Sequence, residues 1–175
     1  MRTEIHMINN MKKRNEAARN QLNRKLISPV LMWAIIVVGI AMVFRLVPPR
    51  FVFPVGLYGK ILLFFAACYW VYFFFSAIRV HRQAARSADA ISKIITTGVY
   101  GKVRHPIYSA DIFLAWGLFF YYPDVRFLLG AHLLMFVMLF WMRLEEKVLL
   151  EKFGQEYEHY LACVPKIIPG LKMRR

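Results

Sequence analysis

The sequence contains long stretches without a charged residue, and these constrain its fold more than any other feature. The first is Leu26–Phe44, and the second is Ile61–Ile78, which is rich in Phe and Tyr. A helix that spans the hydrocarbon core of a bilayer needs about 20 mostly apolar residues. With a few flanking residues added, these two stretches predict membrane-spanning helices at about 26–47 and 55–78.

Two shorter apolar stretches follow in the second half of the chain. Residues 107–122 are interrupted only by Asp111, and residues 127–142 carry no charge at all. The four residues between them include Pro, Asp and Arg, and Pro and Asp are typical of a tight turn. We therefore predict a transmembrane hairpin, with spans at about 107–122 and 127–142.

The alternative is a soluble helical bundle, but the composition argues against it. The chain is 59% hydrophobic, whereas soluble domains are about 45–50% apolar. Surface helices of soluble proteins also need a polar face, and the phenylalanines at 64, 65 and 73–75 leave no room for one. We predict an all-α polytopic membrane protein with about four transmembrane helices. A basic tail (1–25) precedes a single transmembrane domain (26–175), which ends in a cytoplasmic helix and strap.

The positions of the positive charges predict how these helices are oriented. The chain has 24 Lys and Arg against 10 Asp and Glu, for a net charge of +14. Twenty of the 24 lie in three clusters, at 2–25, 79–104 and 143–175. Four spans place all three clusters on one side, as the positive-inside rule requires of the cytoplasmic side. We therefore expect both termini in the cytoplasm, and a location in the cell membrane if the organism is prokaryotic.

So much positive charge could also indicate a protein that binds nucleic acid, but such a domain is not this hydrophobic. We expect no nucleic-acid partner. The default partner of the basic clusters is the bilayer, with anionic lipid at its cytoplasmic face. The tail could form an amphipathic helix on such lipid, or it could be a solvated orientation signal.

One polar segment, residues 96–108, leads directly into the third predicted span. Pro106 suits the first turn of a helix, where its missing N–H costs nothing. Arg104 and His105 then lie at a helix N-terminus, which is a favourable place for an anion such as a carboxylate or phosphate. Tyr108 can face the same side of the helix as His105. Alternatively, these residues are only interfacial anchors and part of an aromatic belt.

A second polar segment continues the fourth predicted span as a helix that Gly154 stops. Glu145 and Glu146 lie just where the chain leaves the bilayer, and carboxylates near hydrocarbon are costly unless they are paired. Their partners could be Arg104, Arg143, or the hydroxyls and cations of a ligand. The alternative is a solvated helix with ion pairs along its own surface. Beyond this helix, two prolines near the end of the chain predict an extended strap across the cytoplasmic surface.

Four motifs follow one another over about 94–170. They are T-T-G-x-Y-x-x-V-R-H-P-x-Y from Thr96, R-x-E-E-x-x-L from Arg143, F-G-x-E-Y-x-x-Y from Phe153 and V-P-x-x-I-P from Val164. In this order and spacing they resemble the membrane-embedded methyltransferases. That superfamily includes the isoprenylcysteine carboxyl methyltransferases and the phospholipid N-methyltransferases.

The resemblance implies a cytosolic pocket for S-adenosylmethionine built from these motifs, with S-adenosylhomocysteine as the product and no metal. It implies that Arg104 and Arg143 orient the acceptor and that Glu146 takes part in the reaction. Pro169 would complete the lid over the cofactor. Asp111 departs from the family's pattern, which leads us to expect an apolar residue there, and it could face the active-site cavity. The cofactor-binding residues that it implies are Tyr100, Arg104, His105, Pro106, Tyr108, Glu145, Glu146, Tyr157, Tyr160 and Pro165.

We therefore expect a membrane methyltransferase that acts on a lipophilic acceptor. A carboxylate acceptor of the isoprenylcysteine type needs a cation to hold it but no base, and O-methylation of a prenylated substrate is our leading hypothesis. The alternative is N- or S-methylation of a phospholipid or small amphiphile, where an amine must first lose a proton to His105, Glu146 or Asp111. A non-enzymatic membrane scaffold is the third possibility.

Overall fold

A computed structural model describes residues 28–80 and 93–171, and every regular element in these residues is a helix. This confirms the predicted all-α class. The basic tail and most of the basic loop between the second and third apolar stretches lie outside the described residues, as do the last four positions. The helices are α2 (Pro29–Leu46), α3 (Leu57–Val80), the short 3₁₀ helix η2 (Gly98–Gly101), α4 (Pro106–Tyr121), α5 (Val125–Phe153) and α6 (Gln155–Cys163).

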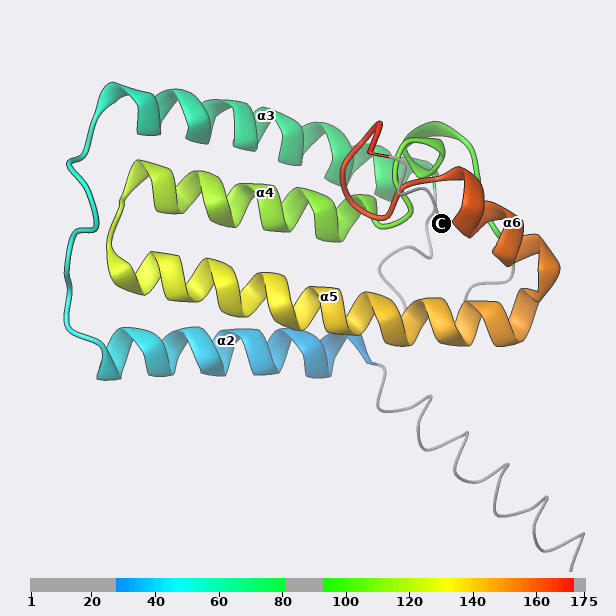
Figure 1. Cartoon of the computed structure of the whole chain (residues 1–175), viewed down its shortest axis with the longest axis horizontal. Coiled ribbons are helices and arrows are strands. Elements are labelled where there is room, and N and C mark those ends of the chain that lie inside the picture. The colour runs from blue at the N-terminus through cyan, green and yellow to red at the C-terminus, as the bar shows by residue number, and fades with distance from the viewer. Residues whose placement is uncertain (1–27, 81–92, 172–175) are drawn as a thin grey trace, which may run out of the picture.

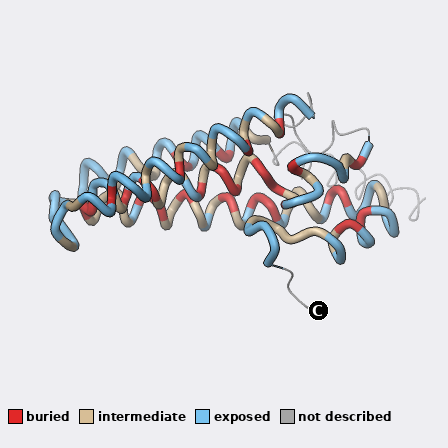
Figure 2. The backbone as a smooth tube through the Cα atoms, turned by 90° about the horizontal axis from the view of Figure 1, so that it is seen from above, coloured by how far each residue is buried: buried red, intermediate tan, exposed pale blue. Residues whose placement is uncertain are grey.

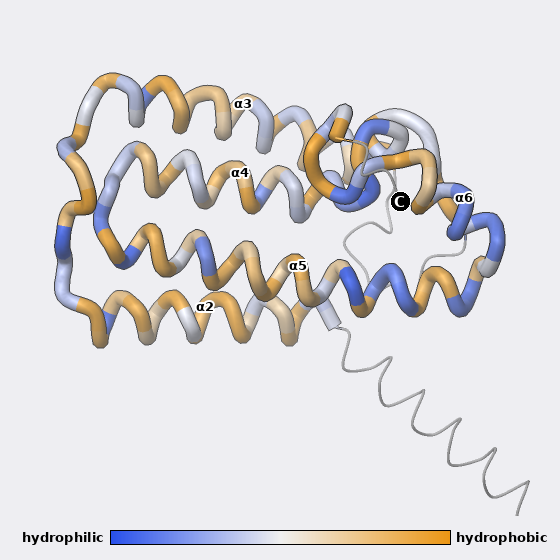
Figure 3. The backbone as a smooth tube through the Cα atoms, in the orientation of Figure 1, coloured by the Kyte–Doolittle hydropathy of each residue, from blue (hydrophilic) through white to orange (hydrophobic). Residues whose placement is uncertain are grey.

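Four long helices lie side by side in the order α3, α4, α5, α2 (Figure 1). The α2–α3 connection and the α4–α5 turn lie together at one end of this array. At the other end lie η2, the start of α4, the projecting part of α5, α6 and the strap Val164–Leu171; we call this the polar end. The hydrophilic residues of α5 and α6 gather there, whereas the helices away from it are mostly apolar (Figure 3).

Three of the helices, α2, α3 and α5, are long and apolar enough to cross a membrane. Their outward faces are apolar and exposed, as at Phe64 of α3, which is 64% exposed (Figure 2). Such surfaces suit lipid rather than water. Together with the family described below, these helices identify an integral membrane protein.

The third predicted span corresponds to α4, which has only 16 residues and is therefore about 24 Å long. Because the hydrocarbon core is about 30 Å thick, a count of four spans stays a prediction at this helix. The second span begins later than predicted, at Leu57 instead of 55, and Pro54 and Gly56 in the preceding segment account for the late start. As predicted, α5 continues past Met142 without a break and stops at Gly154, whose φ of +56° favours glycine.

The predicted turn between the third and fourth spans is organised by Asp124. This residue is fully buried and caps α5 by accepting a hydrogen bond from the Arg126 amide at 2.9 Å. Its other oxygen accepts from the Arg50 amide at 3.0 Å, and its carboxylate also pairs with the Arg126 side chain. The α2–α3 connection is thereby attached to the α4–α5 turn.

At the polar end, the first motif is fastened to the array by its apolar residues. Val99 of η2 and Val103 are buried against Phe73 and Ala77 of α3. Burial of this kind stabilises by about 25 cal/mol per Å² of apolar surface removed from water. The loop that carries Arg104 and His105 therefore has a fixed place beside α4.

The close approach of α3 and α4 depends on glycine. A Cβ atom at Gly59 would lie 2.2 Å from the backbone oxygen of Phe120, and one at Gly117 would lie 2.6 Å from the Ala66 side chain. Small residues that let two backbones approach are a common basis of helix packing in membranes.

We expect Gly59→Ala to lower the melting temperature of the detergent-solubilised protein by several degrees, since the two backbones must separate to admit the methyl group. The matched control is Gly130→Ala on α5, where the added atom would make an ordinary 3.8 Å contact with Ile40. Equal melting temperatures for the two variants would contradict this account of the packing.

Candidate active site

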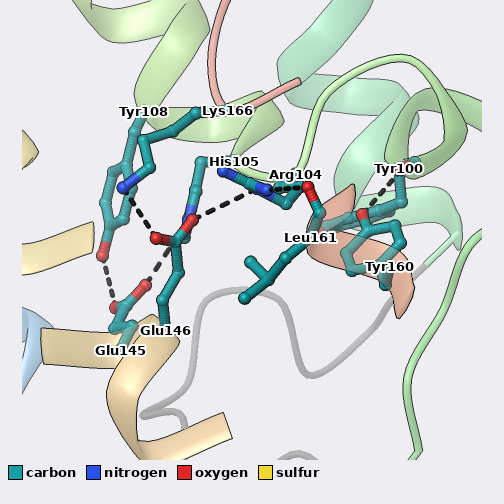
Figure 4. Close-up of polar contacts among 9 residues, drawn as sticks. All are labelled: Tyr100, Arg104, His105, Tyr108, Glu145, Glu146, Tyr160, Leu161 and Lys166. Carbon is teal, nitrogen blue, oxygen red and sulfur yellow. Dashed lines mark hydrogen bonds and ion pairs between the residues drawn. The ribbon is translucent and has the colours of Figure 1, made fainter. Parts of the chain in front are cut away.

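Glu146 is the centre of a charged cluster at the polar end (Figure 4). Its Oε1 atom lies 3.2 Å from Nε of Arg104 and 3.1 Å from Nε2 of His105, and its Oε2 atom lies 2.6 Å from Nζ of Lys166. The side chains of Arg104, His105 and Glu146 are only 7–14% exposed. The predicted pairing of the glutamates with Arg104 is therefore correct for Glu146.

Sequence reasoning missed Lys166. It lies at a variable position of the V-P-x-x-I-P motif, and one lysine among 24 basic residues carries no signal of its own. Only the folded strap brings its ammonium group to the carboxylate.

Glu145 has a different set of contacts from its neighbour. Its Oε1 atom accepts a hydrogen bond from the Tyr108 hydroxyl at 2.6 Å, and its Oε2 atom lies 3.8 Å from Nδ1 of His105. The His105 ring stacks on the Tyr108 ring with centroids 5.7 Å apart. His105 thus lies between the two glutamates, with one ring nitrogen toward each.

The strap is attached to the start of α4 through backbone hydrogen bonds. The amides of Arg104 and His105 donate to the carbonyls of Pro165 and Lys166, at 2.9 and 3.2 Å. The Ser109 hydroxyl donates to the Ile167 carbonyl at 2.7 Å. These two amides, which lie just before the first residue of α4, are therefore used within the protein.

The helix α6 is attached to the same loop. The Tyr160 hydroxyl donates to the Tyr100 carbonyl at 2.6 Å, and the Arg104 guanidinium donates to the Leu161 carbonyl at 2.7 Å. The four motifs, which are far apart in sequence, are thus joined by direct contacts.

The two glutamates lie beyond the apolar part of α5 and differ in electrostatics. Burial alone would raise the pKa of Glu146, but the hydrogen bonds from His105 and Lys166, with the charges of His105 and Arg104, outweigh it and lower this pKa to about 2. Burial raises the pKa of Glu145, and the nearby His105 and the Tyr108 hydrogen bond counter this only in part. Glu146 is therefore firmly ionised, whereas Glu145 holds a proton more readily.

Two cavities meet at this cluster. The small cavity, of about 620 Å³, lies toward α2 and is lined by Tyr108, Glu145, Tyr157 and other residues. The large cavity, of about 1340 Å³, lies between α3, α4, α5 and the strap, and Glu146 lines it. Arg104 lines both cavities.

Most of the predicted cofactor residues line the small cavity. Glu146 and Pro165 line the large cavity instead. The predicted residues on the small cavity are Tyr100, Arg104, His105, Pro106, Tyr108, Glu145, Tyr157 and Tyr160.

Three further predicted residues have distinct positions. Arg143 is exposed and lines the large cavity, and it makes no ion pair with another described residue. Asp111 lines neither cavity, contrary to our expectation, because its Oδ1 atom accepts a hydrogen bond from Trp70 of α3 at 2.7 Å. Pro169 is exposed and lines neither cavity, although Ile168 and Leu171 on either side of it line the large one.

Comparison with protein-family models supplies the identification. The model of the phospholipid methyltransferase family matches residues 57–156, from the start of α3 to the start of α6. The chain belongs to this family. The match includes both halves of the charged cluster, at Arg104–His105 and at Glu145–Glu146. No curated protein and no solved structure matches the chain.

Membership of the phospholipid methyltransferase family, together with the apolar helices, establishes an integral membrane methyltransferase that acts on a lipid-type substrate. Methyltransferases of this family generally take the methyl group from S-adenosylmethionine. In the described part of the chain, His, Cys, Asp and Glu do not form a group that could hold a metal ion.

The lowered pKa of Glu146 predicts an acid dependence of stability. A carboxyl group whose pKa falls from 4.5 to about 2 on folding stabilises the fold above pH 4.5, and this contribution is lost as the pH falls toward 2. The melting temperature of the unaltered protein should exceed that of Glu146→Gln by several degrees at pH 7, and the difference should shrink between pH 5 and pH 3.

The control for this series is Glu151→Gln, which changes an exposed glutamate on the same helix. It should differ little from the unaltered protein across the whole range. A Glu146→Gln difference as large at pH 3 as at pH 7 would contradict the assigned ion pairs.

Proposed function

We propose that the protein moves a methyl group from S-adenosylmethionine in the small cavity to a lipophilic acceptor in the large cavity. The observation that carries this proposal is the wall between the two cavities. Glu145 lines the small cavity, Glu146 lines the large one, and Arg104 lines both. A transfer between two ligands requires two binding spaces that meet at one group of fixed side chains.

The residues of the small cavity fit the cofactor. A volume of about 620 Å³ is within the usual range for small-molecule sites. Glu145 would accept hydrogen bonds from ribose hydroxyls or an amino group, and Tyr108 and Tyr157 offer aromatic faces to the adenine ring. Arg104 would pair with the carboxylate of the amino-acid part.

The residues of the large cavity fit a lipid. Its walls away from the cluster are apolar and come from α3, α4 and α5, for example at Phe65, Trp116 and Leu139. An acceptor with a hydrocarbon chain can place that chain among these residues while its head group lies near Arg104 and Arg143.

When bound, S-adenosylmethionine supplies an electrophilic methyl group, so that the acceptor–carbon bond forms while the carbon–sulfur bond breaks and the electron pair leaves on a neutral thioether. For a carboxylate acceptor no proton moves. Arg104 and Arg143 would hold the carboxylate, and the packed cluster would fix its position. Positioning of this kind can supply a large share of a rate enhancement.

A second candidate is N-methylation of an amine head group, which resembles the reaction named by the family. One observation favours it, namely the His105–Glu146 contact of 3.1 Å, because His105 in its neutral form, oriented by Glu146, could take the proton that an amine must lose. Asp111 is not available as the base on this route, since it lines neither cavity and is bonded to Trp70.

We further propose that the polar end faces the cytoplasm, where the soluble cofactor enters, and that anionic lipid is its partner surface. Lys93, Lys102, Arg104, Arg143, Lys147, Lys152 and Lys166 all lie at this end. The positive-inside rule then assigns both termini to the cytoplasmic side.

Calorimetry with S-adenosylhomocysteine in detergent tests the cofactor site. We expect Glu145→Gln to weaken binding at least tenfold, because a charge-assisted hydrogen bond to the ligand is lost. The exposed Glu151→Gln on the same helix is the matched control and should bind as the unaltered protein does. Absence of binding by the folded, unaltered protein would refute the proposed function.

Arg143 is expected to act on the acceptor alone. Arg143→Ala should lower kcat/KM for a farnesylated N-acetylcysteine carboxylate at least tenfold. Its affinity for S-adenosylhomocysteine should stay within twofold of the unaltered protein, because Arg143 does not line the small cavity. Loss of cofactor affinity in this variant would show that the two cavities are wrongly assigned.

A further inference from the structure

We propose that Lys166 determines head-group specificity in the large cavity by excluding primary amines and favouring anionic groups. The inference rests on the proposed function in one respect, the assignment of the large cavity to the acceptor. It concerns a residue of the strap that is outside the paired-glutamate and R-H-P motifs.

Both carboxylate oxygens of Glu146 already face positively charged groups. Oε1 is shared by Arg104 and His105, at 3.2 and 3.1 Å. Oε2 faces Lys166, whose Nζ atom lies 2.6 Å away. Glu146 therefore has a cation on each oxygen before any ligand arrives.

Lys166 carries the same kind of charged group as an amine substrate. A lysine side chain ends in an ammonium group with three donors and one positive charge, as does a protonated ethanolamine head group. Glu146 and Glu158 are the carboxylates that line the large cavity, and Glu158 is exposed on α6. Lys166 is thus already paired with Glu146, the buried carboxylate to which an amine head group would otherwise bind.

Backbone hydrogen bonds of the strap hold Lys166 in place. Its carbonyl accepts from the His105 amide at 3.2 Å, and the preceding carbonyl, of Pro165, accepts from the Arg104 amide at 2.9 Å. The tether is therefore short and fixed at its base. A group held in this way competes with a free ligand at a high effective concentration.

An excess of positive charge remains among the residues that line the large cavity. Three cations, Arg104, Arg143 and Lys166, line it, against the two carboxylates. The excess is positive, and the exposed Arg143 makes no ion pair with another described residue. An amphiphile with an oxyanion head, either carboxylate or phosphate, matches this charge and the apolar walls behind it.

The experiment measures binding without the cofactor, in nanodiscs of neutral phosphatidylcholine. Dodecanoate, dodecyl phosphate and dodecylamine are titrated into the protein by calorimetry. We expect both anions, or one of them, to bind at least tenfold more tightly than the amine, and their ranking identifies the oxyanion. In Lys166→Met we expect anion binding to fall about tenfold and amine binding to rise about tenfold.

Two variants serve as controls. Lys166→Arg keeps the positive charge and should keep the preference for anions. Lys147→Met removes an exposed positive charge from α5, one residue beyond Glu146, and should behave as the unaltered protein does, which separates the local effect from that of net charge. If Lys166→Met does not fold, Lys166→Gln, which keeps a polar side chain, replaces it in the same titrations.

The outcomes separate the two proposals. Equal head-group preferences in Lys166→Met and the unaltered protein, or tighter binding of the amine than of both anions by the unaltered protein, would overturn the role of Lys166. Failure to bind S-adenosylhomocysteine would overturn the proposed function instead. With labelled S-adenosylmethionine, Lys166→Met should also transfer methyl groups to phosphatidylethanolamine at least tenfold faster than the unaltered protein does.

Discussion

The ion pairs around Glu146 are the interaction on which the polar end depends. A carboxylate with little exposure is costly unless cations surround it, and here the cations come from the start of α4 and from the strap, while Glu146 itself belongs to α5. Removal of α5 would leave these cations without their shared carboxylate, and removal of either of the other segments would leave one oxygen of Glu146 without a cation. The same contacts that bring the motifs together also form the wall between the two cavities.

This arrangement gives adjacent residues opposite surroundings. Glu145 and Glu146 are neighbours on one helix, yet Glu145 lies on the small cavity beside Tyr108, and Glu146 lies on the large cavity beside Lys166. Successive residues of a helix point about 100° apart, so a pair of this kind can contact both ligands of a transfer reaction. His105 lies between the two carboxylates and contacts both, with Nδ1 toward Glu145 and Nε2 toward Glu146.

Much of the fold could be predicted from hydropathy alone. The uncharged stretches correspond to α2, α3, α4 and the apolar part of α5, and Gly154 ends α5 as expected. The start of α3 was harder to predict, because Pro54 and Gly56 delay the helix within an apolar sequence. The span count depends on α4, whose length falls short of a bilayer.

Part of the candidate site could also be predicted from the sequence. Charged residues near hydrocarbon need partners, and this correctly paired Arg104 with a glutamate. Contacts between residues far apart in the sequence could not be predicted, which is why Lys166 was missed and the hydrogen bond between Asp111 and Trp70 was not foreseen. No periodicity relates residue 166 to Glu146, or Asp111 to Trp70 on another helix.

The unbroken course of α5 fixes how far the site lies from the hydrocarbon. Glu146 follows Met142, the last residue of the apolar stretch, by four positions, which is about 6 Å along a helix. A lipid head group at the bilayer surface is at a similar depth. An acceptor could therefore enter sideways and react while its chains stay within their own leaflet, so that the protein need not extract a lipid in order to modify it.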